Sequence, residues 1–244
     1  MIRGRWSYYA LYIPTLLLMT VYLTTIGAIT PFRQRMEVAT LWGEFTGRFW
    51  LKWGAGIHVE VHGEQHIPNE PFVILSNHQS EWETLFLPRI MRPTAIVLKA
   101  SLTKIPVYGW AMKRAHPIAV DRSSPRGSIQ DILVKGEQRL RTGHSVLIFA
   151  ESKRVPPKTL QKYTRTGSKL AINAGVPVLP VVHNSGDCWS PKRWFRPGKI
   201  TLIIGEPIHT KDADATELTA RVQSWAKDNY PGTLEDDTPS RAES

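Results

Sequence analysis

Short runs of apolar residues recur along the chain, and each is followed by polar residues. The runs cover residues 72–75, 94–98, 117–120, 145–149 and 176–182. Uninterrupted runs of this length are typical of strands buried on both faces of a parallel sheet. Between and after them lie segments with helical periodicity, at residues 84–91, 126–141, 166–174 and 216–230. This succession predicts an α/β domain with a mostly parallel central sheet flanked by helices.

Two further segments extend the predicted sheet. Apolar and polar residues alternate over residues 57–61, which predicts a strand, and residues 199–207 close the sheet. His58, His62 and His66 follow each other at four-residue intervals. On a strand such residues lie about 13 Å apart, too far to share one metal ion. We therefore predict no metal site there.

The N-terminal pattern differs from that of the sheet. Residues 8–29 are mostly apolar and long enough to span a bilayer, but arginines flank them on both sides and give no orientation. Residues 38–53 mix aromatic and charged side chains, which indicates an interfacial amphipathic helix, with core packing of the tryptophans as the alternative. We predict a membrane-associated helical hairpin at 1–54, an α/β domain at 55–230 and a flexible polar tail at 231–244.

The densest polar cluster follows the run 72–75. Ligands bind at the carboxyl ends of parallel strands, which is where Asn77 and His78 fall, and Glu83 lies near the first turn of the next helix. A neutral imidazole can take a proton from an alcohol, and a carboxylate on its other nitrogen fixes the tautomer. The alternative is that Ser80 and Glu83 form only a helix capping box.

These residues resemble the first motif, Asn-His-x4-Asp, of the glycerolipid acyltransferases related to lysophosphatidic acid acyltransferase. Glu83 replaces the aspartate. The resemblance extends to roughly residues 55–210. It includes an apolar run before Asp121-Arg122, a lysine followed by an Ile-Pro and Gly-Trp stretch at 99–110, and an apolar segment at 176–182. Where the family has Pro-Glu-Gly-Thr-Arg, the chain has Ala150, Glu151, Ser152, Lys153 and Arg154, so the head group of the acceptor stays open.

The resemblance implies a function and a set of site residues. His78, oriented by Glu83, would act as the general base on the free hydroxyl of a lysophospholipid acceptor, with acyl-CoA or acyl-ACP (acyl carrier protein) as donor. The expected phosphate-binding residues are Lys99, Arg122, Lys153 and Arg154, and the expected substrate-orienting residues are Asn77, Glu151 and Ser152. No metal or organic cofactor is expected. The expected location is the bacterial inner membrane, with the catalytic domain on the cytoplasmic face.

Composition narrows the alternatives. The net charge of +10 suggests an anionic partner, either nucleic acid, an acidic membrane or a phosphorylated substrate. No aromatic RNA-binding signature is present, so we expect no nucleic acid. The single cysteine, Cys188, excludes an internal disulfide and lacks a recognisable catalytic partner. The remaining alternatives are another acceptor, such as a different lysophospholipid or an acylated amino-acid lipid, and a non-catalytic relative that only binds lipid.

Overall fold

The central sheet organises the fold. The computed structural model describes residues 3–91, 93–121, 123–189 and 195–235. Within them, a seven-stranded sheet has the order β1-β7-β6-β2-β5-β3-β4. Its strands are β1 (Ile57–His62), β2 (Val73–Ser76), β3 (Thr94–Lys99), β4 (Ile118–Val120), β5 (Ser145–Phe149), β6 (Val178–His183) and β7 (Gly198–Ile204). The predicted strands are therefore present, although β1 rather than β7 forms the edge.

The strand directions bring the polar segments together. Strands β6, β2, β5, β3 and β4 are mutually parallel, whereas β7 runs antiparallel to β6 and pairs in parallel with β1. The ladder between β6 and β7 covers only Val181 to His183, after Pro180. A proline has no amide hydrogen to donate, which agrees with incomplete pairing there. The mostly parallel sheet is confirmed. The carboxyl ends of its five mutually parallel strands lie along the same side of the sheet.

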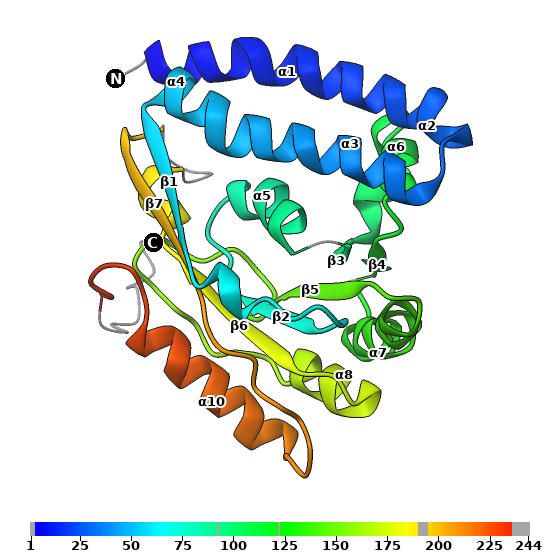
Figure 1. The fold of residues 1–244 in the computed structure, drawn as a ribbon, viewed down its shortest axis with the longest axis vertical. Helices are drawn as coiled ribbons and strands as arrows, with labels where there is room; N and C mark the ends of the chain where they lie inside the picture. The colour runs from blue at the N-terminus through cyan, green and yellow to red at the C-terminus, as the bar shows by residue number, and fades with distance from the viewer. Residues whose placement is uncertain (1–2, 92, 122, 190–194, 236–244) are drawn as a thin grey trace.

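Helices cover both faces of the sheet (Figure 1). One face carries α5 (Trp82–Ile90) with the N-terminal helices above it, and the other carries α7 (Pro125–Arg141), α8 (Thr166–Ala174) and α10 (Ala215–Asp228). The short helices α6 (Tyr108–Arg114) and α9 (Ser185–Cys188) follow β3 and β6. Helix α8 ends at Gly175, whose φ of +67° suits a glycine C-cap.

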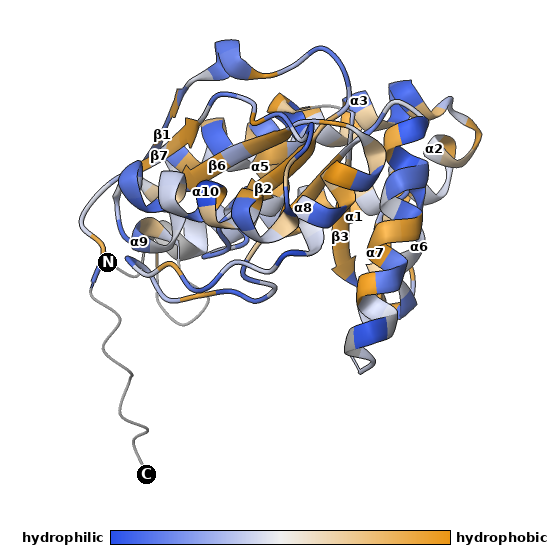
Figure 2. Ribbon diagram, turned by 90° about the horizontal axis from the view of Figure 1, so that it is seen from below, coloured by the Kyte–Doolittle hydropathy of each residue, from blue (hydrophilic) through white to orange (hydrophobic). Residues whose placement is uncertain are grey.

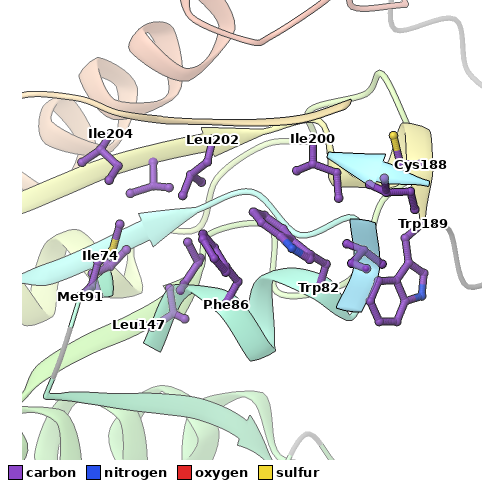
Figure 3. Packing of buried hydrophobic residues seen from close by; sticks show 14 of the residues in the cluster. Ile74, Trp82, Phe86, Met91, Leu147, Cys188, Trp189, Ile200, Leu202 and Ile204 are labelled. Atoms are coloured by element: carbon purple, nitrogen blue, oxygen red, sulfur yellow. The ribbon is translucent and has the colours of Figure 1, made fainter. Parts of the chain in front are cut away.

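Alternate residues of the buried strands supply two cores. Ile74 of β2 packs with Trp82 and Phe86 of α5, as Figure 3 shows, whereas Val73 and Leu75 belong to the cluster on the opposite face. In Figure 2 the strands β2 and β3 are mostly hydrophobic, while α7 mixes hydrophobic and hydrophilic positions. A strand buried on both faces needs apolar residues at every position, which explains the uninterrupted runs in the sequence.

The N-terminal segments form an antiparallel helical layer over α5 and α6 (Figure 1). It consists of α1 (Arg3–Thr24), α2 (Ile26–Ile29), α3 (Phe32–Glu44), a π-helix (Phe45–Trp50) and α4 (Leu51–Ala55). Residues Trp6–Ile29 are long and apolar enough to cross a membrane. Large apolar side chains are exposed along the layer: Trp6, Ile13, Leu17, Leu18, Val21, Ile26, Ile29, Val38, Leu41, Phe45, Phe49 and Trp53.

Aromatic contacts attach this layer to the α/β domain. Tyr8 is fully buried, and its ring makes edge contacts with Trp189 and Phe195. The indole Nε1 of Trp50 donates to the carbonyl oxygen of Tyr8 at 3.0 Å. Trp53, in contrast, is exposed. Trp50 therefore packs inward, as the core-packing alternative predicts, whereas Trp53 faces outward and its place at a membrane interface stays a prediction.

Candidate active site

The turn between β2 and α5 carries the proposed catalytic pair. Strand β2 ends at Ser76 and α5 begins at Trp82, so His78 lies in the turn and Glu83 in the first helical turn. The imidazole Nδ1 of His78 lies 2.8 Å from Oε1 of Glu83. A carboxylate only accepts hydrogen bonds, so Nδ1 carries the proton and Nε2 of the neutral ring is left as an acceptor. This is the tautomer that a general base requires.

Glu83 is fully buried and accepts several hydrogen bonds. Besides His78, the backbone amides of Gln79 and Ser80 donate to Oε1, each at 2.8 Å. The hydroxyl groups of Ser80 and Ser185 donate to Oε2 at 2.5 and 3.0 Å. Burial alone raises the pKa of Glu83, but nearby His183 and His78, together with hydrogen bonds from His78 and Ser80, lower it to about 2. The carboxylate is therefore ionised at neutral pH.

The capping interpretation of Glu83 holds alongside the catalytic one. Its bond to the amide of Ser80 is the reciprocal half of a capping box, and the amide of Trp82 donates to Oγ of Ser80 at 3.1 Å. The same carboxylate oxygen, Oε1, also accepts a hydrogen bond from Nδ1 of His78. One side chain thus starts the helix and orients the imidazole.

The ring and backbone of His78 are both held by the segment around the end of β5. The imidazole stacks on Phe149, with ring centroids 4.0 Å apart and an angle of 12° between the planes. The amide of His78 donates to Oε2 of Glu151 at 2.9 Å, and its carbonyl oxygen accepts from the amide of Val155 at 2.8 Å. Such contacts restrict the imidazole to one orientation.

Two residues predicted to orient the substrate, Asn77 and Glu151, bond to the backbone around the turn. The amide group of Asn77 is fully buried and pairs with the main chain of His183, at 2.8 Å to its carbonyl oxygen and 3.1 Å to its nitrogen. The other oxygen of Glu151 accepts from the amide of Gln161 at 2.8 Å. The side chains of Asn77 and Glu151 thus hold the turn between β2 and α5, and their predicted role in orienting the substrate stays a prediction.

Ser152 lies in an exposed turn just after Glu151. Its φ is +61°, in the left-handed region that glycine adopts without strain. Its amide donates to the carbonyl oxygen of Phe149 at 2.9 Å. The serine therefore has a backbone conformation suited to glycine, at the position where the resembled motif has glycine, and its role toward substrate stays a prediction.

The cationic residues surround the same edge of the sheet. Lys99, Lys153 and Arg154 are exposed, and Nη1 of Arg154 lies 3.5 Å from Oε1 of Glu81. Arg122 lies outside the described residues. Asp121 precedes it and accepts from the backbone and hydroxyl of Ser123, which keeps the pKa of Asp121 below its usual value. Phosphate binding by these residues stays a prediction.

Several residues of the site carry no local signal in the sequence. Phe149, Gln79, His183, Ser185 and Tyr230 all contact the turn or its partners. For Ser185 the only indication came from the predicted topology, since it lies three residues after the predicted strand 176–182, which ends at the same edge of the sheet. Tyr230 follows a helix at the far end of the chain and offered none.

Comparisons with known proteins agree with this geometry. The family model described as Acyltransferase matches residues 58–184. The chain is 41% identical, over 83% of its length and 80% of the relative's, to the 1-acyl-sn-glycerol-3-phosphate acyltransferase of Pseudomonas aeruginosa. This chain belongs to the acyltransferase family. The yeast 1-acyl-sn-glycerol-3-phosphate acyltransferase is 30% identical over 66% of this acyltransferase and 55% of the yeast protein.

A solved structure has the same fold. The crystal structure of the 1-acyl-sn-glycerophosphate acyltransferase PlsC from Thermotoga maritima superposes on this acyltransferase with a TM-score of 0.71. The match covers 92% of each chain at 22% sequence identity. It extends beyond the family match at residues 58–184, so the N-terminal helical layer and the C-terminal part of the domain share the arrangement.

Proposed function

We propose that the chain transfers a fatty acyl group from an acyl thioester to the free sn-2 hydroxyl of lysophosphatidic acid and so forms phosphatidic acid. The observation that carries this proposal is the contact of 2.8 Å between His78 and the buried, ionised Glu83. The name of the Pseudomonas aeruginosa relative, 41% identical to this chain, supports the choice of acceptor.

The reaction follows from the tautomer of His78. Nε2 accepts the proton of the acceptor hydroxyl as its oxygen attacks the thioester carbonyl. A new C–O ester bond forms, the C–S bond breaks, and the sulfur leaves with the proton returned by His78. Glu83 stabilises the transient imidazolium through Nδ1. General-base assistance of this kind contributes about 10²- to 10⁴-fold, and positioning of the two substrates supplies the rest.

Cationic side chains at the same edge suit the phosphate of the acceptor. Arg154 and Arg122 can form two parallel hydrogen bonds with a phosphate, whereas Lys99 and Lys153 act as point charges. Arg154 is held near the turn by Glu81, which precedes α5. A dianionic phosphate competes for this guanidinium more strongly than one exposed carboxylate does.

We infer that the N-terminal helices attach the enzyme to the bacterial inner membrane, with the α/β domain on the cytoplasmic face. The apolar helix within Trp6–Ile29 and the exposed apolar side chains of α1 and α3 support attachment to lipid. The cytoplasmic face holds both acyl-CoA and acyl-ACP donors, and the acyl tail of a lipid acceptor then remains in the bilayer during the reaction.

The experiment uses the purified chain in vesicles of defined phospholipids. Labelled acyl-CoA and acyl-ACP are supplied separately, each with lysophosphatidic acid, another lysophospholipid or an acylated amino-acid lipid. His78→Ala removes the proposed base, and His58→Ala is the matched control, because His58 is exposed on β1 at the edge of the sheet.

We expect labelled phosphatidic acid from the wild type and from His58→Ala, and a loss of at least about 10²-fold in His78→Ala. Transfer only to a different acceptor would overturn the choice of lysophosphatidic acid. Absence of transfer to every acceptor from both donors, by folded protein, would leave a non-catalytic lipid-binding relative. The donor that supports the higher kcat/KM identifies the thioester used.

A further inference from the structure

Ser185 contacts the catalytic pair from a segment remote in sequence. It is the first residue of α9, separated from the end of β6 by one residue, and its side chain is fully buried. Its hydroxyl donates to Oε2 of Glu83 at 3.0 Å and lies 2.8 Å from the hydroxyl of Ser80. The other carboxylate oxygen of Glu83, Oε1, accepts a hydrogen bond from Nδ1 of His78 at 2.8 Å. Glu83 therefore connects Ser185 to the imidazole.

The segment that carries Ser185 is fixed to the catalytic turn on both sides. Before it, the main chain of His183 pairs with the amide group of Asn77. After it, the amide of Gly186 donates to Oε1 of Gln79 at 3.2 Å, and a Cβ at Gly186 would meet Cβ of Gln79 at 3.0 Å. These contacts set the distance between Ser185 and Glu83, so the hydroxyl is preorganised rather than free to turn away.

We propose that Ser185 is a positioning residue for acyl transfer, which holds the carboxylate of Glu83 in the plane that aims the imidazole of His78 at the acceptor hydroxyl. This inference rests on the proposed function and adds a residue to its site. Without the Ser185 hydroxyl, Oε2 retains only the bond from Ser80. Oε1 keeps its three donors, so the carboxylate stays in place but its plane is less restrained. The imidazole then leaves its reactive orientation for part of the time.

The length of the Glu83 side chain provides a specific test. Its carboxylate reaches His78, the turn amides and Ser185 at once, whereas an aspartate there ends one methylene earlier. A shorter side chain can keep the carboxylate in contact with the turn only by losing its contact with Ser185. In a Glu83→Asp background the Ser185 hydroxyl should therefore no longer influence catalysis.

The experiment measures kcat and KM for Ser185→Ala, Glu83→Asp and the double variant, in the vesicle assay. We expect Ser185→Ala to lower kcat about tenfold, equivalent to about 1.4 kcal/mol, and to change KM less than about twofold. In the Glu83→Asp background the same change should lower kcat less than about twofold, because the interaction is already absent.

Ser168→Ala is the matched control. Ser168 is also a fully buried serine, and its hydroxyl lies 2.7 Å from that of Thr219 in the core beneath α8 and α10. We expect it to lower the melting temperature about as much as Ser185→Ala and to leave kcat unchanged. An equal loss of kcat in Ser185→Ala and Ser168→Ala would show a general effect of removing a buried hydroxyl and would overturn the proposal.

Two other outcomes would also overturn it. One is an unchanged kcat in Ser185→Ala, and the other is the same fold loss in both Glu83 backgrounds, which indicates packing alone. If Glu83→Asp is too slow to measure, the proton shared by His78 and Glu83 is followed instead by NMR with ¹⁵N-labelled histidine. Its signal should shift on Ser185→Ala only when Glu83 is present. The NMR measurement needs no turnover, so a failure of the proposed function remains distinguishable.

Discussion

The backbone amide of His78 donates a hydrogen bond to Oε2 of Glu151 at 2.9 Å, so a carboxylate from the segment after β5 holds the main chain of the proposed base. The second oxygen of Glu151 binds the amide of Gln161 at 2.8 Å. Glu151 therefore joins the catalytic turn to the long connection that precedes α8. Its contacts in the structure fix the position of His78, and a contact with the acceptor stays a prediction.

The ionisation of Glu151 should be visible in the stability of the protein. Burial raises its pKa to about 7, although the two backbone donors favour the ionised form. The folded state therefore keeps this proton up to about pH 7, whereas the unfolded chain releases it near pH 4.5. Between these values the unfolded state binds fewer protons, so this group lowers the free energy of unfolding as pH rises, by about 3 kcal/mol in total.

Glu151→Gln removes this titration. We expect the free energy of unfolding of Glu151→Gln, minus that of the wild type, to increase by about 3 kcal/mol from pH 4.5 to pH 8. Urea denaturation at several pH values measures the difference, which isolates Glu151 from other titrating groups. Glu83 has its pKa lowered to about 2, so its contribution to the free energy of unfolding rises with pH, and it does so only below about pH 4.5. A pH-independent difference would contradict the assignment of this pKa to Glu151.

Phe149 should affect turnover through the orientation of the His78 ring. The two rings are stacked with centroids 4.0 Å apart. Aromatic pairs contribute about 0.5–1.5 kcal/mol beyond burial, so Phe149→Leu should lower kcat about 2- to 12-fold with little change in KM. Phe149→Tyr keeps the stacked ring and serves as the control. Steady-state kinetics would refute this role if leucine and tyrosine gave the same kcat.

Arg154 and Glu81 should have opposite effects on the binding of the acceptor. Their side chains lie 3.5 Å apart and both are substantially exposed. Arg154→Ala removes a phosphate partner and should raise KM for lysophosphatidic acid about tenfold. Glu81→Gln frees the guanidinium and should lower this KM by less than about fivefold, since an exposed pair is weak.

The control for Arg154 is Arg141→Ala on α7. Arg141 is also exposed and paired with a carboxylate, that of Glu137. The KM of Arg141→Ala for lysophosphatidic acid should equal that of the wild type. If Arg154→Ala and Arg141→Ala raised KM equally, the effect would come from overall charge and not from a phosphate site.

Tyr230 should support the catalytic turn from the C-terminal end of the chain. Its hydroxyl accepts from the amide of Lys158 and from Nε2 of Gln79, both at 3.1 Å, and its side chain is buried. Tyr230→Phe removes the acceptor of the Lys158 amide and one of the two acceptors of Gln79 Nε2, and should lower the free energy of unfolding by about 1 kcal/mol. Urea denaturation measures this, with the half-buried Tyr22→Phe as control. No difference between the two variants would count against the contact.

The beginning of the predicted tail is attached to the same region. The amide of Glu235 donates to the carbonyl oxygen of Lys158 at 2.8 Å. The sequence predicted a flexible segment from residue 231, because its residues are polar and acidic. A backbone hydrogen bond of this kind leaves no compositional signal, so only the fold could reveal it.

The strands and the polar residues that follow them could be predicted from the residue pattern alone. The run 72–75 is apolar at every position because β2 is buried on both faces, where alternate residues enter different cores. The spacing of His78 and Glu83 across a turn predicted their contact, since helix initiation places the carboxylate beside the turn. Local patterns of this kind depend on neighbours in the chain, so they can be read without a fold.

The distant groups that complete the site could not be predicted in this way, because the fold brings them together. Three features join segments far apart in sequence. Strand β7 lies between β1 and β6, Asn77 and Glu151 contact distant backbone groups, and Ser185 contacts Glu83. A hydrogen bond between such segments depends on strand order and on the packing of whole elements. Neither leaves a periodic trace in the residues concerned, because the same serine or glutamate would suit an exposed loop equally well.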